Sequence, residues 1–205
     1  YNPFECIKTN ILGTQNVIES SIKNKVTKVI GLSTDKASNP VNLYGASKLA
    51  SDKLLVAANN ITGENMTKFS VVRYGNVLDS RGSLVEQLKI IIKTKNRNFN
   101  LTDRNMTRFW ITANEAINFV VFSTKEMIGG EIFVPKIPSM KTLEVITSAM
   151  SDLKIKIVGP RPGEKIHENL ISEDEARQTY EYEDHYRIFP HIFEHTQNYI
   201  KFKPL

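Results

Sequence analysis

Residues 28–48 read KVIGLSTDKASNPVNLYGASK, and this stretch decides the fold. Its apolar first part, residues 29–32, predicts a buried strand that ends at polar residues. Tyr44 and Lys48 lie four positions apart, so on a helix they share one face and are one turn from each other. Because the chemistry of open α/β sheets gathers at the carboxyl ends of strands, we expect residues 34–36 to lie beside Tyr44.

The same stretch carries a candidate proton acceptor. A neighbouring ammonium favours the phenolate form of a tyrosine, so Tyr44 with Lys48 is suited to take the proton of a hydroxyl that loses a hydride. Alone, this spacing occurs by chance in many helices, and Thr34, Asp35 and Lys36 alone suit a helix cap or a turn. Together, after an apolar strand, the two motifs are far more specific for an active site.

Composition and charge narrow the class of protein. The 205 residues are 40% hydrophobic and 24% charged, which is typical of one globular domain, or of one domain and a small lobe. No apolar run reaches the ~18 residues that span a membrane. The net charge of +5 comes from scattered residues, which suit a nucleotide-like anion better than a nucleic acid. The single cysteine, Cys6, fits a reducing compartment. We therefore expect a cytoplasmic protein that binds neither membrane nor nucleic acid.

The histidines give no sign of a metal site. His191 and His195 are four residues apart, but only Glu194 lies nearby as a further ligand. We therefore expect no bound metal.

Strands and helices are expected to alternate along the chain, which predicts a parallel sheet. The expected strands span residues 28–33, 69–73, 131–135 and 154–158, and the expected helices span about residues 43–60, 84–94, 112–126 and 141–150. A helix opens the chain, and Gly-x-Gly-x-x-Gly, which normally follows the first strand of a dinucleotide-binding sheet, is absent. The tail from Tyr180 is expected to be irregular.

We therefore expect an α/β fold whose first part is missing. Residues 1–98 would form the C-terminal part of a Rossmann-type parallel sheet without its first βαβ units, and they would carry the catalytic residues. Residues 99–205 would form mainly a small C-terminal α/β substrate lobe, with elements that return to the sheet.

Several further segments carry a family resemblance. They are RYGNV (73–77), SRGS (80–83), MTRFWI (106–111), GEIFVPK (130–136) and RPGEKIHE (161–168). With residues 33–48, they resemble the extended short-chain dehydrogenases/reductases of the polysaccharide-biosynthesis group. The nearest match is the inverting UDP-N-acetylglucosamine 4,6-dehydratases, which open pseudaminic acid synthesis. Asp79 departs from the pattern, because relatives usually have a glycine there and glycine adopts positive φ more easily.

The resemblance implies a dehydratase that uses NADP or NAD. Tyr44 would remove the C4 hydroxyl proton of the hexose with help from Lys48, and Thr34 would bind the C4 oxygen. Asp35 would protonate the leaving C6 hydroxyl, and Lys36 would take the C5 proton. An exposed, solvated Lys36 is the alternative. The resemblance further implies a fragment without its nucleotide-binding half, which would be inactive alone.

Binding residues are implied in the same way. Ser33 would hold the cofactor together with Tyr44 and Lys48. The arginine side chains in glycine-bearing loops suit the diphosphate of UDP-N-acetylglucosamine. The candidate substrate-binding residues are Asn76, Arg81, Arg161 and Glu164. The alternative to substrate binding by Arg161 and Glu164 is a salt bridge between them on the surface. Arg73, at the end of its predicted strand, can equally belong to a buried structural pair.

Three other functions fit parts of the pattern. A UDP-sugar 4-epimerase would share Tyr44 and Lys48 but would not need Asp35 and Lys36. A membrane-bound, non-inverting dehydratase would carry Met near the position of Tyr44. A non-catalytic interaction protein on a degraded dehydrogenase fold would have no reason to keep these side chains. The full-length protein is expected to be a homo-oligomer.

Overall fold

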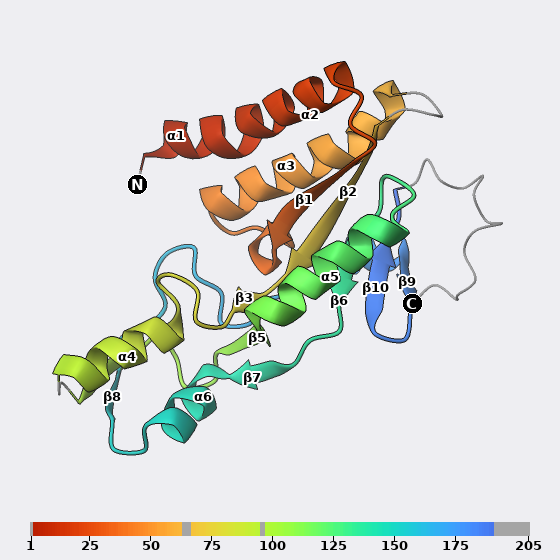
Figure 1. The fold of residues 1–205 in the computed structure, drawn as a ribbon. Coiled ribbons are helices and arrows are strands. Elements are labelled where there is room, and N and C mark those ends of the chain that lie inside the picture. Colours follow the sequence, from red (N-terminus) through yellow and green to blue (C-terminus); the bar gives the residue numbers. More distant parts are fainter. Residues whose placement is uncertain (1, 63–66, 95–96, 191–205) are drawn as a thin grey trace. The chain divides into compact units, whose positions relative to one another are not determined.

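The computed structural model describes residues 2–62, 67–94 and 97–190, and the chain divides into two compact units (Figure 1). Unit 1 comprises Tyr1–Tyr74, Asn118–Lys136 and Asn169–Leu205, and unit 2 comprises Gly75–Ile117 and Ile137–Glu168. The units are thus interleaved along the chain, whereas the expected domains are consecutive. The division into residues 1–98 and 99–205 stays a prediction.

A five-stranded sheet forms the centre of unit 1 (Figure 1). Its order is β1 (Lys28–Thr34), β2 (Lys68–Tyr74), β6 (Ile132–Pro135), β10 (His185–Ile188) and β9 (Thr179–Glu181). β1, β2 and β6 are parallel, which confirms the expected α/β fold, whereas β10 pairs antiparallel with both β6 and β9. In the β1–β2 register, Ser33 lies opposite Arg73 and Thr34 opposite Tyr74, so polar residues of both strands reach the same edge.

The β9–β10 hairpin corrects one expectation. The prediction of an irregular tail from Tyr180 is wrong for the residues up to Ile188, because this segment contains β9 and β10. The buried side chains of the hairpin include Thr179, His185 and Arg187, which are polar. The apolar alternation that normally marks a strand is therefore absent from this sequence.

Helices pack on both faces of the sheet in unit 1 (Figure 1). On one side lie α1 (Pro3–Ile7), the π-helical turn Lys8–Leu12, α2 (Gly13–Lys23), α3 (Leu43–Ala58) and the 3₁₀-turn Asn59–Ile61. α3 approaches β1 closely because Gly31 has no side chain: a Cβ there would lie 2.1 Å from Leu55 Cδ1. The unit 1 part of α5 (Ala113–Glu126) covers the other face, where the shared core contains Val72, Phe119, Val120, Met127 and Phe133.

Unit 2 is built from short strands and helices. β3 (Asn76–Val77) pairs with β5 (Thr107–Ile111), and β5 pairs with β7 (Ser139–Lys141). β4 (Asn98–Leu101) pairs with β8 (Lys154–Ile157), and the helices are α4 (Leu84–Thr94) and α6 (Thr142–Ala149). Their common core consists of Leu88, Phe99, Leu101, Met106, Ile146 and Met150. Across the parts of the chain that the structure describes, no helix has the length and apolar character to cross a membrane.

Candidate active site

The connection between β1 and α3 is fixed by two side-chain caps. β1 ends at Thr34, whose hydroxyl caps the 3₁₀-helix Asp35–Ala37 by accepting a hydrogen bond from the Lys36 backbone N–H at 3.4 Å. α3 begins after Asn42, whose Oδ1 accepts from the Gly45 N–H at 2.8 Å. The strand therefore turns into the helix within a few residues, as the sequence predicts.

A glycine lets α3 approach this connection closely. A Cβ at Gly45 would lie 2.3 Å from the Lys36 carbonyl oxygen, so a larger residue requires a backbone shift. Tyr44, the residue before it, is 45% exposed. One turn further on, Lys48 Nζ donates to the Leu32 carbonyl at 2.7 Å. The structure thus brings the start of α3, with its Tyr–Lys pair, against the segment that carries Lys36.

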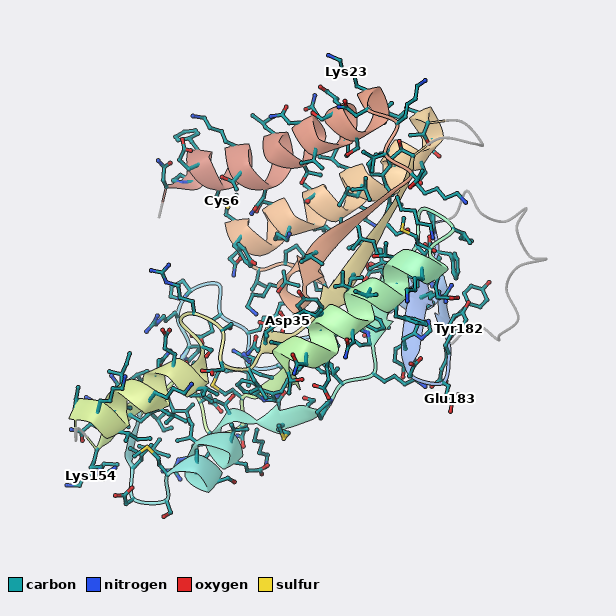
Figure 2. All side chains as sticks on the ribbon, in the orientation of Figure 1. Cys6, Lys23, Asp35, Lys154, Tyr182 and Glu183 are labelled. Atoms are coloured by element: carbon teal, nitrogen blue, oxygen red, sulfur yellow. The ribbon has the colours of Figure 1, made fainter. Side chains whose placement is uncertain are left out.

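Asp35 is a fully buried carboxylate at the carboxyl end of β1, where Figure 2 labels it. Its Oδ1 accepts hydrogen bonds from the Thr34 hydroxyl and from the Lys36 ammonium, both at 2.9 Å. Its Oδ2 is buried and has no hydrogen-bond partner among the described residues. Since a buried acceptor without a partner is unfavourable, this oxygen is suited to meet a polar ligand. The Lys36 side chain is 34% exposed and ion-paired, which differs from the fully solvated lysine of the alternative.

A buried ionic cluster adjoins the end of β1. The Arg73 guanidinium, on β2, is fully buried and donates to Glu175 through Nη1 at 2.8 Å and through Nη2 at 3.0 Å. Nη2 also lies 3.3 Å from Asp52 Oδ2, which accepts from the Ser33 hydroxyl at 2.6 Å. Ser33, Asp52, Arg73 and Glu175 are called the Arg73 cluster below. The alternative for Arg73, a buried structural pair, is therefore confirmed.

Burial and charge act against each other in this cluster. Burial raises the pKa of Asp52, while Arg73, Ser33 and Lys48 act in the opposite direction. Burial disfavours the charge on Arg73, but Glu175 and Asp52 outweigh it and raise the pKa of the guanidinium. Burial also disfavours the charge on Glu175, but Arg73 lowers the pKa of this carboxyl below its ordinary value. The Arg73–Glu175 pair is thus held ionised, whereas in Asp52 burial outweighs the neighbouring charges and the net pKa is raised.

Two members of the Arg73 cluster are not among the residues predicted from the sequence. Asp52 follows Lys48 by four residues and shares its face of α3, a signal that could have indicated it. Glu175 lies in α7 (Glu173–Ala176), 102 residues from Arg73, and no local pattern links the two.

The candidate substrate-binding residues all lie in unit 2. Asn76 lies in β3, and Arg81 and Arg161 are exposed in loops. Glu164 accepts hydrogen bonds from the Thr102 hydroxyl at 3.0 Å and from the Arg161 backbone N–H at 3.3 Å. The contact between Arg161 and Glu164 thus involves the arginine backbone and leaves its guanidinium exposed in the loop.

Asp79 adopts the backbone conformation that the glycine of relatives suggests. Its φ is 60°, in the left-handed region that aspartate tolerates better than most residues. Its Oδ1 accepts from Lys89 Nζ at 2.5 Å, which holds the loop against α4. The departure from the family pattern therefore leaves the local turn intact.

No metal-binding group of three or more His, Cys, Asp or Glu side chains occurs within residues 2–62, 67–94 and 97–190. The pair His191 and His195 lies outside the described residues.

The parallel β1–α3–β2 unit, with charged groups at the end of β1 and a Tyr–Lys pair on the following helix, is that of a Rossmann-type short-chain dehydrogenase/reductase. The chain belongs to the family described as "Polysaccharide biosynthesis protein", which matches residues 1–190. The recognition of this group from the sequence is confirmed.

Three proteins illustrate what the chain is similar to. The chain is 56% identical over 192 residues to a Campylobacter jejuni protein named UDP-N-acetylglucosamine 4,6-dehydratase (inverting). This match covers 94% of the chain and 58% of the Campylobacter protein. The chain is 39% identical over 193 residues to a UDP-glucose 4-epimerase of Rickettsia canadensis, at 92% and 56% coverage. The X-ray structure of Pen from Bacillus thuringiensis is 39% identical with a TM-score of 0.87, at 94% and 61% coverage. The chain therefore spans somewhat more than half the length of the proteins it matches.

Proposed function

We propose that the complete protein is an inverting UDP-N-acetylglucosamine 4,6-dehydratase, a hydro-lyase that makes a UDP-4-keto-6-deoxy-aminohexose. The observation that carries the proposal is the close contact at Gly45, which joins the first turn of α3 to the segment of Lys36. The 56% identity to a protein of that name supports it. The protein would act in the biosynthesis of surface glycans that contain pseudaminic acid. It would assemble as a homo-oligomer.

Tyr44 and Lys48 are assigned to the first step. The C5 proton of a hexose is not acidic until C4 is a ketone, so the C4 hydroxyl must be oxidised before water can leave. Tyr44 would accept the C4 hydroxyl proton with help from Lys48, which lies one turn away on the same face of α3. The Thr34 hydroxyl, next to Asp35 at the end of β1, would bind the C4 oxygen.

Asp35 and Lys36 are assigned to the elimination. Protonated Asp35 would give its proton to the C6 hydroxyl, which leaves as water, and neutral Lys36 would take the C5 proton. The two residues would then be a carboxylate and an ammonium, which is the ion pair that the structure contains at 2.9 Å. Asp35 Oδ2, buried and without a hydrogen-bond partner among the described residues, would be the oxygen that carries the departing proton.

The end of β1 also fits a nicotinamide cofactor, NADP or NAD, which would supply hydride transfer when bound. Lys48 Nζ, which donates to the Leu32 carbonyl at 2.7 Å, would hold the nicotinamide ribose through one of its hydroxyl groups. The Ser33 hydroxyl donates its proton to Asp52 at 2.6 Å, so its oxygen would act as an acceptor toward the cofactor. Tyr44, half-exposed, would complete this set.

The UDP part of the substrate is assigned to unit 2. Arg81 and Arg161 are exposed, and a guanidinium binds a diphosphate through two parallel hydrogen bonds. Glu164, held by the Thr102 hydroxyl, would accept from a ribose hydroxyl. Asn76 would donate to a sugar or phosphate oxygen.

A UDP-sugar 4-epimerase is the second candidate, because one relative at 39% identity carries the name UDP-glucose 4-epimerase. That reaction uses the Tyr–Lys pair but gives no role to a buried acid with an adjacent lysine. The Asp35–Lys36 pair therefore favours the dehydratase.

The experiment is incubation of the complete gene product with UDP-N-acetylglucosamine and either cofactor in heavy water, followed by NMR. We expect a 4-keto-6-deoxy product with inverted configuration and deuterium at C5. Retention at C5 would remove the inverting assignment, and the C4 epimer as sole product would establish the epimerase. Unchanged substrate with both cofactors would favour the non-catalytic alternative.

A further inference from the structure

We propose that Asp52 and Arg73 are positioning residues, which hold the catalytic face of α3 in place against the end of β1. The inference deepens the proposed function and rests on it. Neither side chain is assigned a contact with the reacting atoms. Both act through Lys48 and through residues 32 and 33 of β1.

The first observation is a pair of neighbouring contacts between α3 and β1. Lys48 Nζ donates to the Leu32 carbonyl at 2.7 Å, and Asp52 Oδ2 accepts from the Ser33 hydroxyl at 2.6 Å. Leu32 and Ser33 are consecutive on β1, and Lys48 and Asp52 are one turn apart on α3. The helix is therefore attached to the strand end at two points, and it carries Tyr44 on the same face.

The second observation is that Arg73 fixes the Asp52 contact from β2. Arg73 lies opposite Ser33 in the β1–β2 register, and its guanidinium is fully buried. Nη2 reaches Asp52 at 3.3 Å, while both terminal nitrogens donate to Glu175, at 2.8 and 3.0 Å. Planar two-point binding of this kind fixes direction as well as distance, which a lysine ammonium does not do.

The third observation is the place of Arg73 along the chain. Its neighbour Tyr74 is the last residue of the first segment of unit 1. Leu170 is the second residue of the third segment, which begins at Asn169. Arg73 Nη1 donates to the Leu170 carbonyl at 3.1 Å. Within unit 1, the Arg73 guanidinium thus connects α3 to the end of the first segment and to the start of the third segment. The predicted substrate residues Asn76 and Glu164 lie a few positions beyond them.

Stability alone is a weak reason for such a cluster. Burial of charged groups carries a large desolvation penalty, and well-packed apolar residues often give equal or greater stability than a buried ion pair. Three of the four cluster members are nevertheless buried: Ser33 is 7%, Asp52 1% and Arg73 0% exposed. Directional bonds between β1, β2, α3 and the segment of Glu175 are what these charged groups provide and apolar residues do not.

The test compares Arg73→Lys and Asp52→Asn with a matched control in the complete gene product. Arg73→Lys keeps the charge and loses the planar fork, and Asp52→Asn keeps the shape and loses the charge. The control is Glu131→Gln, because Glu131 is also fully buried in unit 1 and accepts from Ser70 at 2.9 Å and Gly129 at 2.8 Å, away from the end of β1.

We expect both cluster variants to lower kcat about 10- to 100-fold, since a small displacement of a catalytic group has effects of this size. Hydrogen exchange of backbone amides 43–48 should be about 10-fold faster in the same variants, because α3 is held less firmly. Glu131→Gln should lower the melting temperature and leave both kcat and the exchange of residues 43–48 as in the wild type.

Wild-type kcat in the cluster variants, or wild-type exchange at residues 43–48, would overturn the inference. If Arg73→Lys does not fold, Glu175→Gln gives the same comparison. The substitution keeps the shape of the side chain and removes its charge, and the Glu175 side chain is 12% exposed, whereas that of Arg73 is fully buried. A wild-type protein without dehydratase activity would instead refute the proposed function. The exchange measurement, which needs no substrate, would then decide whether the Arg73 cluster positions α3.

Discussion

The two units hold the charged side chains assigned to the candidate site in opposite ways. At the end of β1 in unit 1, Asp35 and Arg73 are fully buried, and each is fixed by hydrogen bonds to neighbouring groups. In unit 2, Arg81 and Arg161 are exposed in loops. The same residue types are thus fixed in one region and solvated in the other.

This difference fits a division of labour between chemistry and binding. Proton transfer depends on groups that are already oriented when the substrate arrives, because reorganisation during the reaction raises the barrier. Binding of a diphosphate tolerates flexible side chains that become ordered on contact. Substitutions in the fixed region should therefore lower kcat, and substitutions in the exposed loops should raise KM.

The largest expected effect comes from Lys36→Ala. Loss of the group that takes the C5 proton should lower the rate of elimination by about 10²- to 10⁴-fold, while oxidation at C4 still reduces the cofactor. Product formation by NMR and nicotinamide absorbance separate the two steps. The control is Lys136→Ala, because Lys136 is also partly exposed and ion-paired in unit 1, to Glu181 at 2.6 Å. Equal elimination rates in both variants would remove Lys36 from the mechanism.

The next effect tests the exposed region. Arg161→Ala and Arg81→Ala should each raise KM for UDP-N-acetylglucosamine roughly 10- to 100-fold, the size expected for loss of a charged hydrogen bond, with little change in kcat. Steady-state kinetics give both constants. Arg104→Ala is the matched control, since Arg104 is also an exposed loop arginine of unit 2. A fall in kcat without a change in KM would contradict the proposed contrast between the two regions.

A smaller effect comes from the glycine at the start of α3. Gly45→Ala places a methyl group 2.3 Å from the Lys36 carbonyl oxygen, so the free energy of unfolding should fall by roughly 1–3 kcal/mol and kcat should fall with it. Denaturant unfolding and turnover measure the two changes. Gly13→Ala is the control, because the nearest atom to its new methyl group, the Lys8 carbonyl oxygen, lies 3.5 Å away. A methyl group in that helix should stabilise it by roughly 0.5–1 kcal/mol. Similar results for both variants would show that the close approach at Gly45 is not needed.

Local patterns were sufficient to predict the strand and the helix that carry the candidate site. The apolar run that ends at Ser33 predicts β1, and the Tyr44–Lys48 spacing predicts the exposed face at the start of α3. The observed bounds, Lys28–Thr34 and Leu43–Ala58, differ from the expected ones by one or two residues, the usual uncertainty at the ends of elements. Periodicity and capping are short-range signals, so a single sequence contains them.

The Arg73 cluster and the β9–β10 hairpin could not be predicted in this way. Arg73 meets Asp52 and Glu175 across 21 and 102 residues, and only the folded chain brings them together. The hairpin buries His185 and Arg187 in place of apolar side chains, so its strands lack the alternation that identifies a strand. Both failures concern buried charged or polar groups, whose partners are distant in the sequence.

His185 provides a case of a fixed group to which no chemistry is assigned. It is 3% exposed on β10, and its ring stacks on Tyr182 with 4.6 Å between centroids. Nδ1 lies 2.6 Å from Asp184 Oδ1, and Nε2 accepts from Arg187 Nε at 3.0 Å. Burial lowers the pKa of the imidazole, Asp184 acts in the opposite direction, and Arg187 adds to the lowering. Neutral His185 is thus the form that the folded state prefers.

The smallest predicted effect is therefore a loss of stability at mildly acidic pH. Because the folded pKa lies below the unfolded value near ~6.5, the unfolded state binds more protons between the two values, and stability is lost as pH falls through this window. The loss is about 1.4 kcal/mol for each unit that separates the two pKa values. Denaturant unfolding from pH 7.5 downward measures it. His185→Gln should remove this part of the slope, whereas His167→Gln, at an exposed histidine of unit 2, should retain it. Equal slopes in the wild type and His185→Gln would show that burial of this imidazole has no consequence for its protonation.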